Sequence, residues 1–208
     1  MRPPDPYADA PRLGGTGPLD PATLFPGLGP LELEIGPGRG GFLFERAAER
    51  PEVRLIGLEI RRKWATLVDR RLAGQGLGAR ARVFAEDVRD GIPRFPEGSF
   101  EAVFVHFPDP WWKARHAKRR VLDAWLVEAV SRVLLPGGLF YVQTDVEDRA
   151  RAVEALVAGA PRLVGVGRGL AGGSGAWLDE SPVAARSPRE RRAMADGLPV
   201  HRLAWRRR

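Results

Sequence analysis

Cysteine is absent from this 208-residue sequence, and histidine occurs only three times. Without thiols the chain can form no disulfide, no cysteine nucleophile and no cysteine-bound zinc. His106, His116 and His201 are too scattered along the sequence to share a metal ion. These absences argue against a metalloenzyme, and no metal is expected as a cofactor.

Long apolar runs are absent as well. No segment of about 18 apolar residues occurs, so no membrane-spanning helix is expected. Residues 1–12 carry prolines and aspartates where a signal peptide needs an apolar core. We therefore expect a cytoplasmic protein without a membrane partner.

Lysine is scarce, since 30 of the 33 basic residues are arginine. With 26 acidic residues the net charge is +7, which favours an anionic partner. A GC-rich coding bias would also enrich arginine, so the position of the charge is the better guide. Residues 111–120 hold five basic residues and no acidic one, and residues 186–208 hold eight arginines against Glu190 and Asp196.

The length and the 44% hydrophobic content fit one globular domain. Residues 1–30 contain eight prolines and five glycines, with too few large apolar residues to pack. We expect a flexible arm over residues 1–30 and a single domain over residues 31–208.

From residue 31 onward, short apolar runs alternate with amphipathic stretches, a pattern typical of a parallel sheet wound with helices. The expected strands are 31–35, 53–58, 82–85, 102–107 and 139–143, with weaker signals near Leu163 and over 200–205. The expected helices are 42–50, 62–73, 122–134 and 146–158. Pro136-Gly137-Gly138 is expected to end the helix before it and turn the chain into the fifth strand. The fold class is α/β, Rossmann-like, with a mostly parallel sheet flanked by helices.

A glycine-rich segment lies between the first strand and the first helix. Gly36, Gly38 and Gly41 can bring the backbone close to a ligand at a helix N-terminus. The same spacing fits the dinucleotide fingerprint, and a glycine turn can also be only a turn. Glu34 before the first glycine, and the lack of a second mononucleotide-binding half, favour S-adenosylmethionine over a dinucleotide.

Acidic residues end the next two strands. Glu59 is placed to accept hydrogen bonds from a ribose, and Asp87 from an adenine amino group. Either acid alone could simply cap a solvated strand end. Together with the glycine segment they predict a cofactor site formed by Glu34, Gly36, Gly38, Glu59 and Asp87.

The fourth strand leads into Asp109-Pro110-Trp111-Trp112, followed by five cations. Flanking prolines restrict the backbone at Asp109, although Asp-Pro is also a common turn and tryptophans commonly pack in cores. Aromatic side chains can stack on an extruded base while arginine and lysine bind flanking phosphates. The segment therefore suits a nucleic acid whose base is modified.

These residues resemble the bacterial tRNA (guanine-N7)-methyltransferase family, which acts on guanine 46 of the variable loop. The resemblance runs from about Leu31 to the C-terminus, and its most specific part is the ungapped stretch from Asp109 to Arg120. It implies a class I S-adenosylmethionine-dependent methyltransferase fold, S-adenosylmethionine as methyl donor and tRNA as partner. It also implies a catalytic, cofactor-contacting Asp109, with substrate contacts from Lys113, Arg115, His116, Lys118, Arg119, Arg120 and Asp145. No obligate protein partner is inferred.

The sequence departs from the family pattern near its C-terminus. The family has Thr-x-aromatic-Glu where this chain has Ser187-Pro188-Arg189-Glu190. Ser187 keeps the hydroxyl and Glu190 the carboxylate, so both are expected to contact the substrate, but Arg189 replaces the aromatic.

Guanine N7 carries an exposed lone pair, so methyl transfer needs no strong base. Asp109 is expected either to stabilise the charge that develops on guanine or to hold the base by its N1 and N2 donors. Two alternatives stay open. One is a methyltransferase of the same fold with another substrate, and the other is an RNA-binding protein with a degenerate cofactor site.

Overall fold

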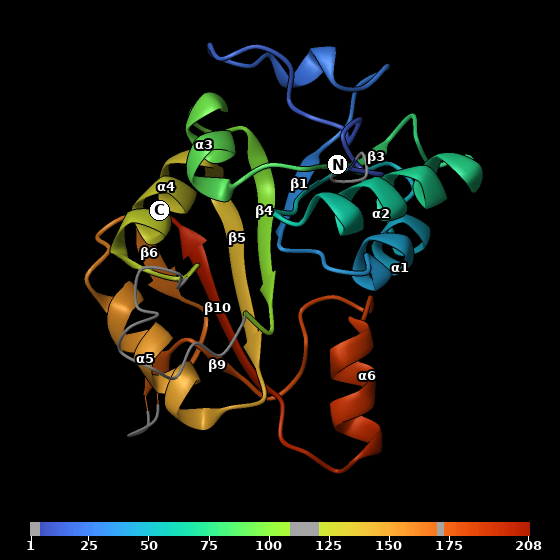
Figure 1. The fold of residues 1–208 in the computed structure, drawn as a ribbon. Coiled ribbons are helices and arrows are strands. Elements are labelled where there is room, and N and C mark those ends of the chain that lie inside the picture. Colours follow the sequence, from blue (N-terminus) through green and yellow to red (C-terminus); the bar gives the residue numbers. More distant parts are fainter. Residues whose placement is uncertain (1–4, 109–120, 170–172) are drawn as a thin grey trace.

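The computed structural model describes residues 5–108, 121–169 and 173–208. The described chain forms one mixed sheet in which neighbours follow the order β3-β2-β1-β4-β5-β10-β9-β7-β8, and β6 also pairs with β10 (Figure 1). Its first five strands are parallel: β1 (Leu31–Ile35), β2 (Arg54–Leu58), β3 (Ala81–Phe84), β4 (Phe100–His106) and β5 (Leu134–Thr144).

β1 shows why this sheet is buried on both faces. Its sequence alternates leucine or isoleucine with glutamate, yet all five residues are buried. Leu33 and its apolar neighbours join the main core, whereas Glu32 and Glu34 point to the opposite face. Both glutamates have a basic or imidazole partner there, which offsets the cost of burying a carboxylate. On one face β1 is therefore buried by apolar packing, and on the other its glutamates are buried with Arg46 and His106 as partners.

Helices cover both faces of the parallel strands (Figure 1). On one face, apolar residues of α4 (Ala124–Val133) and α5 (Glu147–Ala158) pack in the main cluster. On the other face, α1 (Gly41–Glu49) and α2 (Arg62–Gly74) pack with β2 and β3. This two-sided cover is what parallel strands require. It leaves the carboxyl ends of the strands as the open edge.

The C-terminal part extends the sheet with antiparallel strands. β10 (His201–Arg207) pairs antiparallel with β5, and the strands beyond it are short. These short strands are β6 (Leu163–Gly165), β7 (Gly167–Arg168), β8 (Ser174–Gly175) and β9 (Trp177–Leu178). The remaining helical elements are α3 (Val88–Gly91), α6 (Pro188–Ala195) and the 3-10 turns η1 (Pro21–Thr23) and η2 (Ile92–Arg94).

The expected elements from residue 31 to residue 158 are confirmed, with ends that differ by a few residues. The interpretation of Pro136-Gly137-Gly138 is wrong. α4 ends at Val133, and β5 already begins at Leu134, opposite Phe100. Residues 135–138 then bulge out opposite Glu101 before pairing resumes at Leu139. A proline is tolerated within this strand because the bulge interrupts the hydrogen-bond ladder where its N–H is missing.

The segment before β1 packs more than its composition suggested. Leu13, Leu19 and Phe25 are buried in the main core, so the expectation that too few apolar residues are available to pack is wrong. The Arg94 side chain donates to the Leu13 carbonyl oxygen at 2.8 Å, and Ala85 N–H donates to the Pro11 oxygen at 2.7 Å. A few large side chains and hydrogen bonds to the backbone thus hold this segment on the domain without a long helix or strand. Flexibility of residues 1–30 stays a prediction.

Candidate cofactor and substrate site

The carboxyl ends of the parallel strands open onto one cavity of about 620 Å³. This volume lies within the range of about 300–1,000 Å³ that is typical of ligand sites. The structure brings seven of the predicted site residues to the cavity wall: Glu34, Gly36, Gly38, Glu59, Asp87, Asp145 and Ser187. Residues far apart in sequence meet here because parallel strands all end at the same edge.

The glycine segment forms the turn from β1 into α1. Gly36 has φ 70° and Gly38 has φ 55°, which side chains rarely tolerate. A Cβ at either position would meet no protein atom within 4 Å, so the surrounding space is open. Gly36 N–H donates to the Leu58 oxygen at 2.9 Å, which ties the turn to β2. The result is a backbone cradle at the N-terminus of α1, where a ligand can approach closely.

Glu34 lies almost fully buried at the end of β1. Its Oε1 lies 2.9 Å from His106 Nδ1 at the end of β4, and the two side chains are 3% and 5% exposed. His106 also packs against the Phe42 ring, with centroids 4.3 Å apart. Glu34 Oε2 has no hydrogen-bond partner in the described residues. A buried carboxylate oxygen without a donor fits a ligand that carries one.

Glu59 follows β2 and links the cavity to the glycine turn. Its Oε2 accepts from Gly38 N–H at 2.9 Å, and its Oε1 accepts from Arg61 N–H at 2.9 Å. The Arg61 side chain adds a longer contact of 3.2 Å to Oε1 but is 57% exposed. Glu59 itself is 2% exposed. This carboxylate therefore orients the glycine turn while facing the cavity.

Asp87 follows β3 and caps the short helix α3. Its Oδ1 accepts from Arg89 N–H at 2.9 Å. Ile60, which follows Glu59 in the sequence, also lines the cavity and is 66% exposed. An exposed apolar side chain beside carboxylates offers a surface for the flat face of an aromatic base.

β4 ends in a strained turn that leads toward Asp109. Phe107 has φ 47°, a left-handed conformation that is costly for a residue with a large side chain. Phe107 N–H donates to the Gln143 oxygen at 2.8 Å, which holds the turn against β5. Phe107 and Pro108 line the cavity. The predicted site residues that follow lie outside the described residues: Asp109, Lys113, Arg115, His116, Lys118, Arg119 and Arg120.

Asp145 follows β5 and forms an ion pair with Arg189 of α6. Arg189 donates from Nε at 3.1 Å and from Nη2, both to Asp145 Oδ2. The Asp145 side chain is 15% exposed and that of Arg189 is 60% exposed. Both residues line the cavity, so the pair stands at its rim.

The predicted substrate residues Ser187 and Glu190 have structural partners. Ser187 caps α6, because its Oγ accepts from Glu190 N–H at 3.1 Å. Glu190 is 1% exposed and binds the Arg202 guanidinium at 3.0 Å, and it does not line the cavity. Only Ser187 of the two therefore lies at the cavity wall. Substrate contacts from both residues stay predictions.

α1 fixes the position of the segment that precedes α6. Glu49 accepts from the backbone N–H groups of Ala184 and Ala185, and Glu45 accepts from that of Arg186, each at 2.9 Å. The Arg191 side chain lowers the pKa of Glu45 through a hydrogen bond, assisted by the Arg186 N–H. A Cβ on Gly41 would lie 2.3 Å from a Pro188 ring carbon, so the starts of α1 and α6 touch.

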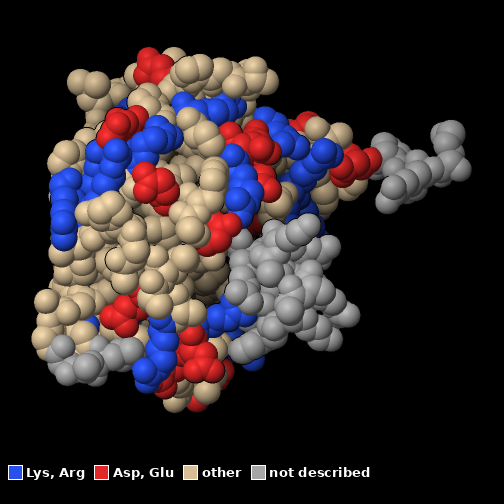
Figure 2. Space-filling view, turned by 90° about the vertical axis from the view of Figure 1, so that its left-hand side faces the viewer, with Lys and Arg blue, Asp and Glu red and all other residues tan. Residues whose placement is uncertain are grey.

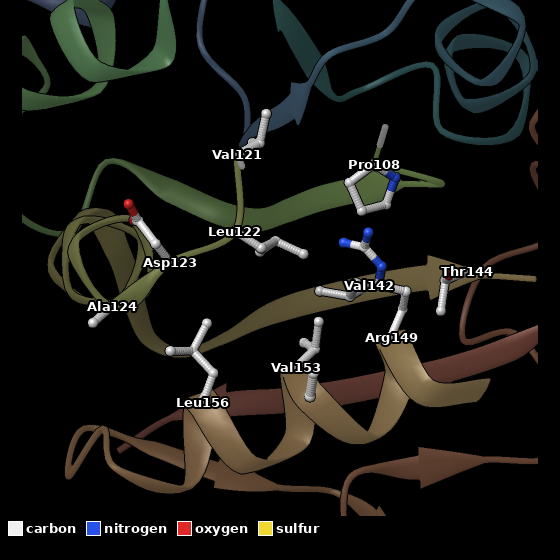
Figure 3. Close-up of a pocket in the computed structure, with 11 residues that line it drawn as sticks. Pro108, Val121, Leu122, Asp123, Ala124, Val142, Thr144, Arg149, Val153 and Leu156 are labelled. Atoms are coloured by element: carbon white, nitrogen blue, oxygen red, sulfur yellow. The ribbon is translucent and has the colours of Figure 1, made fainter. Parts of the chain in front are cut away.

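A smaller apolar recess adjoins the main cavity. Its volume is about 320 Å³, and Figure 3 shows Val142, Val153 and Leu156 pointing into it from β5 and α5. Pro108, Val121, Thr144 and Arg149 line both spaces. The cavity at the strand ends therefore adjoins a second, apolar recess next to α5.

The charge of the described residues is nearly balanced. They contain 27 basic and 25 acidic residues, so +2 of the overall +7 lies in them and most of the remainder lies in 109–120. Figure 2 shows Asp and Glu side chains interspersed among Lys and Arg on one face.

The described helices include none long and apolar enough to cross a membrane. The same residues contain no cluster of three or more His, Asp or Glu side chains that could hold a metal ion.

Two cavity features were missed from the sequence. From the sequence alone, His106 was considered only as a metal ligand, and that role was rejected. Its position near the end of a predicted strand, beside Phe107 and Pro108, could have identified it as a residue of the cavity. The helix α6 was also missed. Ser187-Pro188-Arg189-Glu190 has the Ser-x-x-Glu spacing and early proline of a helix start, which could have revealed it.

Comparisons with known proteins agree with this geometry. Residues 29–170 match a family described as "Putative methyltransferase". A 16S rRNA methyltransferase, KamB, superposes with a TM-score of 0.61 at 15% identity and covers 89% of each chain. A geranyl diphosphate C-methyltransferase from Streptomyces coelicolor A3(2) gives 0.58 at 16% identity, covering 89% of this chain and 74% of that one. Fold and site together define a class I S-adenosylmethionine-dependent methyltransferase.

Sequence relatives narrow the family. The chain is 42% identical over 175 residues to a tRNA (guanine-N(7)-)-methyltransferase of Myxococcus xanthus, covering 84% of this chain and 82% of the relative. It is 45% identical over 176 residues to that of Anaeromyxobacter dehalogenans, covering 84% of each. The chain therefore belongs to the tRNA (guanine-N(7)-)-methyltransferase family, which confirms the predicted fold class, family and methyl donor.

Proposed function

We propose that this protein transfers the methyl group of S-adenosyl-L-methionine to N7 of guanine 46 in the variable loop of tRNA. Membership of the family supports N7 methylation of guanine in tRNA, the activity for which its relatives are named. The position within tRNA comes from the sequence resemblance. The observation that carries the proposal is the cavity, where the predicted cofactor acids and glycines converge beside the chain that leads to Asp109.

The polar groups of the cavity fit the methyl donor. S-adenosylmethionine presents hydrogen-bond donors at its ammonium, its ribose hydroxyls and its adenine amino group, and it carries a net positive charge. The cavity offers acceptors in the unpartnered Glu34 Oε2, in Glu59 and in Asp87. A carboxylate has about four acceptor positions, and Glu59 uses two for backbone N–H groups. The half-exposed Arg61 side chain can yield its position on Glu59 to a ribose hydroxyl.

Bound S-adenosylmethionine supplies an electrophilic methyl group, and guanine N7 supplies the lone pair that attacks it. The task of the chain is to align the two, an entropic effect worth roughly 7–11 kcal/mol in well-oriented systems. Asp109 is proposed to counter the positive charge that develops on guanine or to hold the base by its N1 and N2 donors. The strained Phe107 turn and Pro108 lead the chain from the cavity wall to that carboxylate.

The partner is proposed to be tRNA, bound through the basic residues from Lys113 to Arg120 with contributions from Asp145, Ser187 and Glu190. Phosphate binding by this segment agrees with the charge distribution, since the described remainder is nearly neutral. A cytoplasmic location is part of this proposal, because its substrate is made and used there.

The test uses three tRNA transcripts that differ at position 46 alone. They carry guanine, adenine or 7-deazaguanine, which keeps the pairing edge of guanine but replaces N7 by carbon. Methyl incorporation and its position are measured after incubation with S-adenosylmethionine. We expect methylation of the guanine transcript only, with the 7-deazaguanine transcript bound but unmethylated. Equal methylation of the adenine transcript would contradict the assigned position, and the absence of methylation in all three would contradict the substrate.

A further inference from the structure

The ion pair between Asp145 and Arg189 joins two groups with different tasks at the rim of the cavity. Asp145 is expected to contact the substrate, yet its Oδ2 is held by two nitrogens of one guanidinium. Arg189 occupies the position where the family pattern has an aromatic residue. When RNA binds, Arg189 must therefore either keep its ion pair with Asp145 or break it.

The exposure of the pair favours release. The Arg189 side chain is 60% exposed, so the attraction is screened by water and is worth at most about a five-fold change in an equilibrium constant. A guanidinium binds a phosphate through two parallel hydrogen bonds, which is among the stronger charged contacts in proteins. Arg189 contacts only one oxygen of Asp145, whose side chain is 15% exposed, so a phosphate that offers two oxygens is the better partner for its guanidinium.

The backbone under Arg189 is fixed, so that only its side chain needs to move. Ser187 caps the first turn of α6, and Pro188 abuts Gly41 at the start of α1. Glu45 of α1 binds the Arg191 side chain two residues further along. Arg189 therefore projects from a rigid helix start beside the cavity and can change partner without a change in the fold.

We propose that Arg189 contacts tRNA by partner exchange. In the RNA-free protein its guanidinium rests on Asp145, and in the complex it binds a phosphate next to the target nucleotide. The same movement frees Asp145 to accept hydrogen bonds from the nucleotide. Arg189 is then a further substrate-binding residue, and the ion pair keeps Asp145 neutralised until the substrate arrives. This inference rests on the proposed function.

The test is a double-mutant cycle on the full-length protein, measured as binding of an unmodified tRNA transcript at several salt concentrations. The variants are Arg189→Ala, Asp145→Asn and the combination. The control is Arg162→Ala, which removes a half-exposed, glutamate-paired arginine next to the start of β6, away from the cavity. S-adenosylmethionine affinity is measured in parallel in every variant, so that a change in cofactor binding is separated from a change in tRNA binding.

Exchange predicts that Arg189→Ala weakens tRNA binding about ten-fold and lowers the log–log salt slope by roughly 0.7–0.9, the value for one lost phosphate contact. It also predicts an equal or larger loss in the Asp145→Asn background, where no carboxylate competes for the guanidinium. A static ion pair predicts the opposite, since Arg189→Ala would have no effect once Asp145 is Asn. An unchanged slope, a vanishing effect in that background or an equal effect of Arg162→Ala would overturn the proposal.

The same samples separate this proposal from the proposed function. Methylation of tRNA by the parent protein tests the function, whichever partner Arg189 has in the complex. If the parent protein binds tRNA but yields no 7-methylguanosine, the function fails while the cycle still reports on partner exchange. If methylation is normal and the cycle shows a static pair, only the exchange fails.

Discussion

Glu59→Gln is expected to weaken S-adenosylmethionine binding almost as much as Glu59→Ala. Both carboxylate oxygens of Glu59 accept a backbone N–H, from Gly38 and from Arg61, at 2.9 Å. A glutamine amide has one oxygen, so its NH₂ group must face one of these two donors. The remaining group is then a poorer, uncharged acceptor for the ribose hydroxyls, and hydrogen bonds from the cofactor to a charged acceptor contribute about 1.5–3 kcal/mol each. Since about 1.4 kcal/mol is ten-fold, the cofactor dissociation constant should rise roughly ten- to hundred-fold.

Isothermal titration calorimetry with S-adenosylmethionine measures the effect, and filter binding with tRNA supplies the comparison. The matched control is Glu52→Gln, a carboxylate that precedes β2 at the opposite edge of the sheet and is 54% exposed. We expect no change in cofactor affinity in the control and a much smaller loss of tRNA affinity than of cofactor affinity in Glu59→Gln. Equal losses of both affinities, or cofactor binding like that of the parent protein, would refute the assignment of Glu59 to the cofactor.

Three further outcomes are expected. Arg46→Met should destabilise the fold by about 3–5 kcal/mol in urea unfolding, because it leaves the Glu32 carboxylate buried without its main partner; Arg70→Ala, which breaks an exposed pair with Asp9, should cost about 1 kcal/mol or less. Burial raises the pKa of Glu49, but hydrogen bonds from Ala184, Ala185 and Arg46 outweigh it, so the net pKa lies below its ordinary 4.5. The stabilisation by the Glu49 carboxylate is therefore complete above pH 4.5 and is lost as the pH falls through the lowered pKa. The difference in unfolding free energy between the parent protein and Glu49→Gln should narrow below about pH 4.5 and vanish in acid. A constant difference from pH 7 to pH 3 would contradict a stabilising role for the hydrogen bonds of Glu49 to Ala184 and Ala185. Asp109→Ala should change kcat more than the KM for tRNA in steady-state kinetics, and a near-parental single-turnover rate would exclude a catalytic Asp109.

The parallel half of the fold was predictable because its signals are local. The alternating apolar residues of β1 and the three- and four-residue spacing in α2 each depend on neighbouring residues, and both elements lie where expected. The C-terminal half was harder to predict, since the strands beyond β10 are two or three residues long and exist through pairing with β10 or with one another. The burial of Leu13 and Phe25 also depends on distant partners, which no local pattern reports.

The candidate site divides in the same way. The positions of Glu34, Glu59 and Asp87 follow from one rule, that parallel strands end at a common edge. Partners across the sheet did not follow from any rule. The pairing of Glu34 with His106, and the hold of Glu45 and Glu49 on residues 184–186, join segments between about 70 and 140 residues apart. Such contacts depend on the assembled layers and leave no periodic trace in the sequence.

The most direct test of the central claim is mass spectrometry of nucleosides from tRNA incubated with the protein and S-adenosylmethionine that carries a deuterated methyl group. This single measurement reports the donor, the base and the ring position together. The account predicts 7-methylguanosine with the full deuterium label, formed in the parent protein and strongly reduced in Glu59→Gln at limiting cofactor. Label in another nucleoside, or in none, would contradict it.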